Sequence, residues 1–558
     1  MNRRLFLKAL AAVGGGAIIP QTVSLSSLSS MYKQANAAIN YTSVNISASS
    51  VPSVMPQIIN IFLYGGPSEL AGNLSNIADI EQNSQSKYTD FFPGIVDSQD
   101  VATDGLVTPS GFWGSNKSGI NNEADRGAGG DDMQFLLDQG QMSVYRTMMK
   151  RKNTSQSHRE SILMSQKGSL DIDFAPGFGY KLAALISENR ALYEANTSLA
   201  DGTPISSLAN GVESLVMPFV SVLDGDTRIF DKDSSVTVPL LFNGISVDSA
   251  LNNPFSRSIP NPGADPVAEE AALDAIVQKS LNESSRDYSE VVEAFKLRQE
   301  LADAMGVYDT ADLTVLPTIV PGDLSNPDFV ANGNSATLAY PDTSVGRSLR
   351  AAVTLAIENP ATLFATVGGA FGGWDDHNNG VDRYPRRMRE VFEALRVAMM
   401  HIKYSHNSAT QINSLNRPTD NIIINVFGDF GRRVNLNTSL GWNHGNNQNF
   451  YTLGGARPGL RTAAGSDALG KVVGNTNRVG NAGEDRQFTK PATGSYEFEP
   501  MSVAANIYKY FGVDYASSPI SASNPDPLTS YEDPNNAGQF IDFGSPPIEE
   551  DPTKNGAV

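Results

Sequence analysis

The run IINIFL at 58–63, followed by Tyr64-Gly65-Gly66, decides the fold class of this 558-residue chain. Its apolar residues do not alternate with polar ones, and this pattern is typical of a strand that is buried on both faces. Two further runs have the same character, TLFATV at 362–367 and NIIINVF at 421–427. The run MSVYRTMM at 142–149 is a fourth candidate strand. Strands of this kind are typical of parallel sheets covered by helices.

Helical patterns separate these runs. Over 385–404 apolar residues recur at steps of three and four, and helices are also expected over 160–166, 176–195 and 501–511. The alternation predicts an α/β fold of three layers, with a mostly parallel sheet flanked by helices and interrupted by loop-rich insertions. Within a domain over 38–515, we expect an insertion at about 196–345, and we expect a loosely ordered acidic tail over 516–558.

Composition excludes several classes of function. The chain has 41 Lys+Arg against 60 Asp+Glu, a formal net charge of −19, and no cysteine. The acidic balance argues against nucleic acid as a partner, because phosphate binding needs clustered basic residues. The lack of cysteine excludes disulfides, thiolate metal sites and cysteine nucleophiles. No apolar run reaches the ~18 residues of a membrane span, so no integral membrane span is expected.

The N-terminus reads as an export signal. It begins MNRRLFLK, continues through a short apolar stretch that contains Gly14-Gly15-Gly16, and reaches Ala35-Asn36-Ala37, which suits a cleavage site. The pair Arg3-Arg4 resembles the twin-arginine signal, whereas the glycines make an ordinary secretory signal the weaker interpretation. The expectation is a signal over 1–37, recognition by the twin-arginine export machinery, and a periplasmic or secreted protein.

Acidic and histidine side chains follow the predicted strands, where a parallel sheet gathers its ligands. Asp375 and His377 come after TLFATV, Asp429 comes directly after NIIINVF, and His444 lies shortly beyond it. Carboxylate oxygen and imidazole nitrogen together are a ligand set for divalent metals such as zinc. The alternative is that each acid is an ordinary turn residue and each histidine a hydrogen-bonded structural one.

A second group of reactive side chains lies between a predicted strand and a predicted helix. It is Ser155-Gln156-Ser157-His158-Arg159. A helix N-terminus favours anions and activates nucleophiles, so Ser155, Ser157, His158 and Arg159 are candidate catalytic residues. A serine acting only as an ordinary helix N-cap is the competing interpretation.

Four segments carry a resemblance to a known family. They are GGWDDHNN at 372–379, VFGDFGRR at 426–433, GWNHGNNQNFYTLGGA at 441–456 and KVVGNTN at 471–477. Together they resemble a bacterial family of unknown function, mostly exported by the twin-arginine route, within the alkaline phosphatase–sulfatase superfamily. The resemblance implies an alkaline-phosphatase-like fold and positions that hold two divalent metals.

The resemblance implies which residues of this chain are metal ligands. Asp375 and His377 match the family's Asp-x-His, Asp429 takes its Glu position, and His444 matches the His of its Asp-His-Gly. The segment from Ser155 to Arg159 also resembles a sulfatase motif, with Ser157 in place of its proline.

Two departures weaken the implied metal sites. Ser68 stands where the family has Asp, which leaves Glu69 as the substitute ligand, and Asn443 replaces the Asp before His444.

Two functions are therefore open. The first is an exported metal-dependent hydrolase of phosphate or sulfate esters, acting on a small anionic ester with one or two divalent ions, zinc among them. In it Ser155 or Ser157 is the nucleophile, and Arg159 or Arg432 steadies the anion. The second is a non-catalytic exported binding or surface-assembly protein that keeps the fold with an eroded site, as Ser68 suggests.

Overall fold

A computed structural model describes the chain over 39–67, 129–150, 155–222, 340–405 and 417–515, with gaps at 462–468, 481 and 496. Shorter pieces are described between 227 and 275 and between 517 and 541. The predicted export signal over 1–37, together with Ser68 and Glu69, lies outside the described residues. None of the described helices combines the length and the apolar character that crossing a membrane requires.

The centre of the fold is one sheet of eight strands in the order β10-β2-β9-β6-β1-β5-β3-β4. All neighbours in it pair parallel except β9, which runs antiparallel to both β2 and β6. The expected mostly parallel α/β architecture is therefore confirmed. The strands are β1 (Gln57–Leu63), β2 (Met142–Met149), β3 (Phe219–Val222), β4 (Ile245–Val247), β5 (Phe364–Val367), β6 (Ile422–Gly428), β9 (Asn447–Gly454) and β10 (Val472–Val473).

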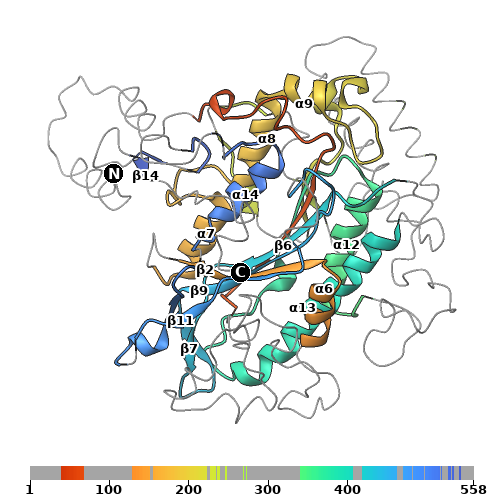
Figure 1. The fold of residues 1–558 in the computed structure, drawn as a ribbon. Helices are drawn as coiled ribbons and strands as arrows, with labels where there is room; N and C mark the ends of the chain where they lie inside the picture. Colours follow the sequence, from red (N-terminus) through yellow and green to blue (C-terminus); the bar gives the residue numbers. More distant parts are fainter. Residues whose placement is uncertain are drawn as a thin grey trace, which may run out of the picture.

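Helices cover both faces of the sheet (Figure 1). One layer holds α6 (Gly130–Asp138), α12 (Ser344–Glu358) and α13 (Gly380–Ser405). The other holds α7 (His158–Lys167), α8 (Phe178–Glu188), α9 (Arg190–Asn196) and α14 (Ser502–Tyr510). In β1, Ile59 and Ile61 join the core of the first layer, while Ile58 and Phe62 join that of the second. Both faces of the strand need apolar side chains, which explains its unbroken apolar sequence.

A row of buried polar side chains crosses the sheet. Asn60 of β1 lies in register with Asn425 of β6 on one side and with Thr366 of β5 on the other. Asn425 is in turn opposite Thr452 of β9, whose hydroxyl donates to Asn425 Oδ1 at 2.9 Å. Ser143 of β2 and Ser221 of β3 extend the row in both directions. Side chains in register point to the same face, so the row forms one line across the strands.

Several boundaries differ from the expectation. The helix expected over 176–195 is interrupted at Asn189, whose side-chain amide donates to the Leu185 carbonyl at 2.9 Å and to the Tyr41 carbonyl at 3.0 Å. This side-chain bond competes with the backbone ladder. Helix α12 was not expected, because its N-terminus adjoins a segment rich in Pro and Asn.

The segments that the sequence predicts as an insertion and as a loosely ordered tail both contribute described residues to the fold. The predicted insertion at about 196–345 supplies β3 and β4, which extend the central sheet beyond β5. Within the predicted loose tail over 516–558, Asp526 and Thr529 are buried, and the buried Lys181 donates to the Leu528 carbonyl at 2.8 Å. A buried ammonium needs acceptors, so this short part of the tail satisfies a core residue.

Candidate metal centre

Four ligand-type side chains meet beyond the carboxyl ends of the central strands. His158 is the first residue of α7, Asp375 and His377 lie in the loop that follows β5, and His444 ends β8 (Trp442–His444). Strand β8 pairs with β7 (Arg432–Leu436), which follows β6. The position is the one where open parallel sheets bind ligands.

Glycine brings the end of β1 against this site. Gly65 has φ +107°, and a Cβ built on it would lie 2.4 Å from the backbone nitrogen of Asp375. Only glycine permits both this backbone conformation and this approach. The backbone that carries Asp375 is therefore packed directly on the end of the central strand.

The ligand atoms of three side chains lie close to the spacing that one metal ion requires, with the two imidazole nitrogens somewhat closer together. His158 Nε2 lies 3.0 Å from His444 Nε2 and 3.3 Å from Asp375 Oδ1, and the last two atoms are 3.4 Å apart. Four tetrahedral ligands at about 2.0–2.2 Å from zinc lie about 3.3–3.6 Å from one another. This group of three could hold a metal ion.

His377 lies beside this group of three without belonging to it. Its Nε2 lies 2.8 Å from His444 Nε2 and 3.1 Å from Asp375 Oδ1. The two imidazoles and the carboxylate of the group are donors that zinc and related divalent ions accept.

Hydrogen bonds on the far side of two rings fix which nitrogen faces the centre. His158 Nδ1 lies 2.6 Å from Asp429 Oδ2, and His444 Nδ1 lies 2.8 Å from the Gln156 carbonyl. A carboxylate and a carbonyl only accept, so both Nδ1 atoms are the donors. In the neutral rings the two Nε2 atoms then carry lone pairs and face one another at 3.0 Å. This contact is repulsive unless a metal ion or a proton lies between them.

Asp429 differs from its expected role as a metal ligand. It is buried directly after β6, and its Oδ2 is bonded to His158 instead. A carboxylate behind a histidine fixes the ring's orientation and raises its basicity. His158, which was expected among the catalytic residues, occupies the ligand position.

The side chain of Arg432 is held by hydrogen bonds within the site. Its buried guanidinium donates to Asp375 Oδ1 at 2.8 Å, to the Gly66 carbonyl at 2.8 Å and to the Trp374 carbonyl at 3.1 Å. It ties the loop after β1 to the loop that carries Asp375, and therefore the role of steadying a substrate anion, considered for it from the sequence, does not fit.

The surroundings of the site shift the pKa values of its side chains in different directions. Burial raises the pKa of Asp375, but the hydrogen bond and charge of Arg432 with the charges of His158 and His377 outweigh it and lower that pKa to about 2. Burial lowers the pKa of His158, yet its bond to Asp429 leaves that pKa above the ordinary value. Burial and the charge of Arg432 lower the pKa of His444. An anionic Asp375 and a neutral His444 suit metal binding.

The serine candidates lie beside this cluster. Ser157 is the N-cap of α7, its Oγ accepting from the Glu160 amide at 3.5 Å, and Ser155 Oγ accepts from the Ser157 amide at 3.2 Å. Ser157 thus has the structural role that competed with catalysis in the sequence. Arg159 is exposed beyond the helix start.

Lys150 was not singled out from the sequence. It directly follows β2, is buried, and donates through Nζ to the Ser155 carbonyl and to Ser161 Oγ. It therefore anchors the segment that carries the Gln156 carbonyl. Its position at a strand end was the available signal, because the same edge holds the other site residues.

Comparison of the chain with protein-family models, with curated proteins and with solved structures finds no match. A function for this chain therefore has to be argued from its motifs and from the geometry of the described residues.

Proposed function

We propose that this protein is an exported, metal-dependent hydrolase of phosphate or sulfate esters, and a relative of the alkaline phosphatase–sulfatase superfamily. The observation that carries the proposal is the convergence of His158 Nε2, His444 Nε2 and Asp375 Oδ1 within 3.4 Å of one another, while the Nδ1 atoms of both rings are bonded elsewhere. The relationship to the superfamily is supported by the motifs around Asp375, Asp429 and His444 and by the mostly parallel sheet.

His158, Asp375 and His444 would hold one divalent ion, and zinc suits imidazole nitrogen together with carboxylate oxygen. His377 lies beside them, its Nε2 2.8 Å from His444 Nε2. When bound, the ion would polarise an ester oxygen and lower the pKa of a water molecule. Asp429 and the Gln156 carbonyl orient His158 and His444 for this task.

The described residues favour water over serine as the nucleophile. Ser157 caps α7, and the Ser155 hydroxyl is bonded to the Ser157 amide at the same helix start. Arg159 lies next to His158 in the chain and is exposed, so it is the cation available to an anionic ester.

The alternative is a non-catalytic exported binding protein on the same fold. The capping role of Ser157 and the presence of Ser68 in place of the family's acid favour it. In that case the cluster holds a metal or a shared proton without turnover.

The test is metal analysis together with ester hydrolysis. Protein purified without chelators should contain about one divalent ion per chain, and should hydrolyse p-nitrophenyl phosphate or p-nitrophenyl sulfate. His444→Ala should lose both the metal and the activity, whereas His401→Gln, which changes a buried histidine bonded to Tyr340, should keep both. A metal-free wild-type protein near neutral pH would refute the hydrolase, and a metal-loaded protein without either activity would favour the binding alternative.

A further inference from the structure

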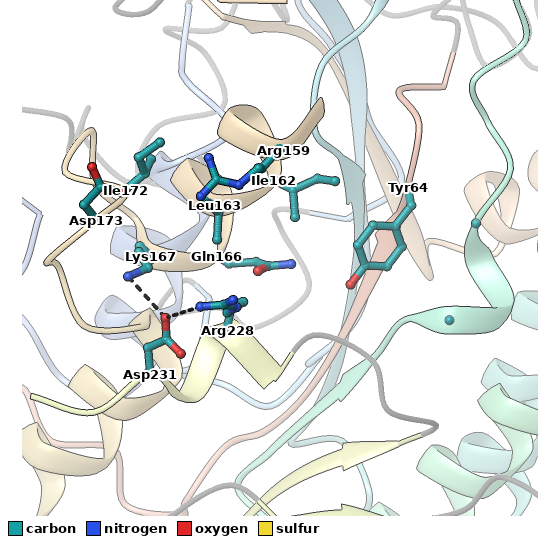
Figure 2. A pocket seen from close by; sticks show the side chains of 12 residues that line it. Tyr64, Arg159, Ile162, Leu163, Gln166, Lys167, Ile172, Asp173, Arg228 and Asp231 are labelled. Atoms are coloured by element: carbon teal, nitrogen blue, oxygen red, sulfur yellow. Dashed lines mark ion pairs between the residues drawn. The ribbon is translucent and has the colours of Figure 1, made fainter. Parts of the chain in front are cut away.

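A cleft of about 660 Å³ opens along α7 next to the candidate metal centre (Figure 2). Its inner wall includes Tyr64, Gly369 and Gly372. The Trp374 amide donates to the Tyr64 carbonyl at 2.9 Å, so this wall is continuous with the backbone that carries Asp375. Because His158 begins α7 and Arg159 lines the cleft, both walls lead directly from the metal centre.

Three cations and two acids line the cleft, and their pairing leaves positive charge in it. The buried Lys167 pairs with Asp231 at 3.2 Å, so that acid is already neutralised. Arg228 lies farther from Asp231, at 3.7 Å, with 64% of its side chain exposed. In the described part of the chain Arg159 has no ion pair. The guanidinium groups of Arg159 and Arg228 are thus available to an anion.

Figure 2 shows that the two exposed guanidinium groups lie in different parts of the cleft. Gln166 and Arg228 lie between Asp231 and Tyr64, whereas the guanidinium group of Arg159 points away from Tyr64, toward the side where Asp173 lies (Figure 2). Arg228 is therefore the exposed cation on the side of the tyrosine ring.

Apolar surface lies between the charged groups. Ile162 and Leu163 of α7 line the cleft, and the ring of Tyr64 lies across from them. Surface of this kind suits a ring or an aliphatic spacer, because it gains from the burial of apolar area.

We infer that the site takes elongated esters that carry a second anionic group, which Arg228 binds while the apolar wall holds the intervening part. This inference rests on the proposed function, which places the reacting ester at the metal centre. Arg228 pairs with Asp231, which also pairs with Lys167 at the end of α7. From His158 to Lys167 the helix rises about 13 Å, so the second anion lies on the order of 10 Å from the ester.

Binding of non-hydrolysable phosphonates to the full-length protein tests the inference by calorimetry. Octane bisphosphonate carries a phosphonate at each end of a chain of suitable length, and octylphosphonate is its matched compound with one charge group. The bisphosphonate should bind about ten-fold tighter or better, because its second phosphonate gains a hydrogen bond between charged groups. Propane bisphosphonate, whose second group cannot reach Arg228, should show no such advantage over propylphosphonate.

Arg228→Gln should abolish the preference for octane bisphosphonate. Arg190→Gln is the matched control, because Arg190 is also an exposed arginine paired with an acid, Glu213, but does not line the cleft. Equal affinity of the wild-type protein for the two octyl compounds, no binding of either, or a preference that survives in Arg228→Gln would overturn the inference.

Metal content and hydrolysis of p-nitrophenyl esters test the proposed function separately. A metal-loaded enzyme without the preference defeats only the inference, and a preference without metal defeats only the hydrolase.

Discussion

Asp429 Oδ2 lies 2.6 Å from His158 Nδ1, so a carboxylate at the end of β6 orients a histidine at the start of α7. Two segments far apart in the chain thereby act as one unit at the site. Asp429 is buried and its other oxygen, Oδ1, accepts no hydrogen bond from the described residues. The carboxylate is thus held chiefly by the ring that it orients.

Asp429→Asn should weaken metal binding by about 10–100-fold without unfolding the protein, because the neutral amide still accepts a hydrogen bond but no longer raises the basicity of His158. Competition with a chelator of known affinity measures the change. Asp420→Asn, which alters an acid paired with Arg457 at 2.7 Å, is the control and should bind as the wild type does. Unchanged affinity in Asp429→Asn would remove Asp429 from the metal centre.

Gly65→Ala should destabilise the protein by more than about 2 kcal/mol and reduce metal binding, because the new Cβ would strike the Asp375 backbone. Gly202→Ala is the matched control, since Gly202 has a similarly positive φ of +87° but no atom within 4 Å of the added Cβ. Gly202→Ala should lower the free energy of unfolding by about 1 kcal/mol, because only the backbone conformation is unfavourable for alanine there. Chemical denaturation of both variants separates the two effects, and equal losses would disprove the close approach.

His401 should make stability fall as the pH is lowered. Burial, with the charge of Arg350, lowers the pKa of His401 to about 4, whereas the unfolded chain has a value of about 6.5. Between these two values the unfolded state binds more protons, so the free energy of unfolding decreases as the pH falls through this window. The full effect is about 3 kcal/mol.

The corresponding variant is His401→Gln, which removes the titrating ring next to the Tyr340 hydroxyl. Denaturation at pH 7 and at pH 5 should show a smaller loss of stability for the variant than for the wild-type protein. If both proteins lose the same free energy over this range, the buried neutral histidine is not the cause.

Ser157→Ala should lower stability by about 1 kcal/mol through loss of the N-cap of α7. Ser155→Ala should keep ester hydrolysis within about ten-fold of wild type if water is the nucleophile. Thermal denaturation and turnover of p-nitrophenyl phosphate measure the two effects. A loss of about a thousand-fold or more in Ser155→Ala alone would instead make that serine the nucleophile.

The central strands could be predicted because burial on both faces leaves an apolar run that no other element of this length explains. The strands β1, β2, β5 and β6 all lie where the sequence has such runs. Helix α12 could not, because the residues before it form a Pro- and Asn-rich connection and its N-cap, Thr343, gives only a local signal. The break at Asn189 and the burial of Asp526 depend on tertiary contacts.

The site could be predicted in part for the same reason. Asp375, His377 and His444 stand near strand ends, and that position alone indicated that they meet. The exchange of roles between His158 and Asp429 could not be read from the sequence, since it depends on which of two neighbouring side chains reaches the centre. The structural role of Arg432 could not be predicted either, because its hydrogen-bond partners include backbone carbonyls from three segments that are far apart in the sequence.

The buried polar row across the sheet has a consequence for how the strands find their alignment. A sheet that is apolar on both faces gives little penalty when one strand slides past its neighbour, because either face accepts the displaced side chains. Asn60, Asn425 and Thr452 raise the penalty for sliding, because a shifted strand would place a polar amide or hydroxyl next to apolar side chains. We therefore expect the double variant Asn60→Leu with Asn425→Leu, which keeps Thr452 as an acceptor for the buried Arg461, to fold with comparable stability but with mixed strand alignment. Hydrogen exchange of β6 and β9 would then show more than one protected population, and a single population would mean that the turns alone set the alignment.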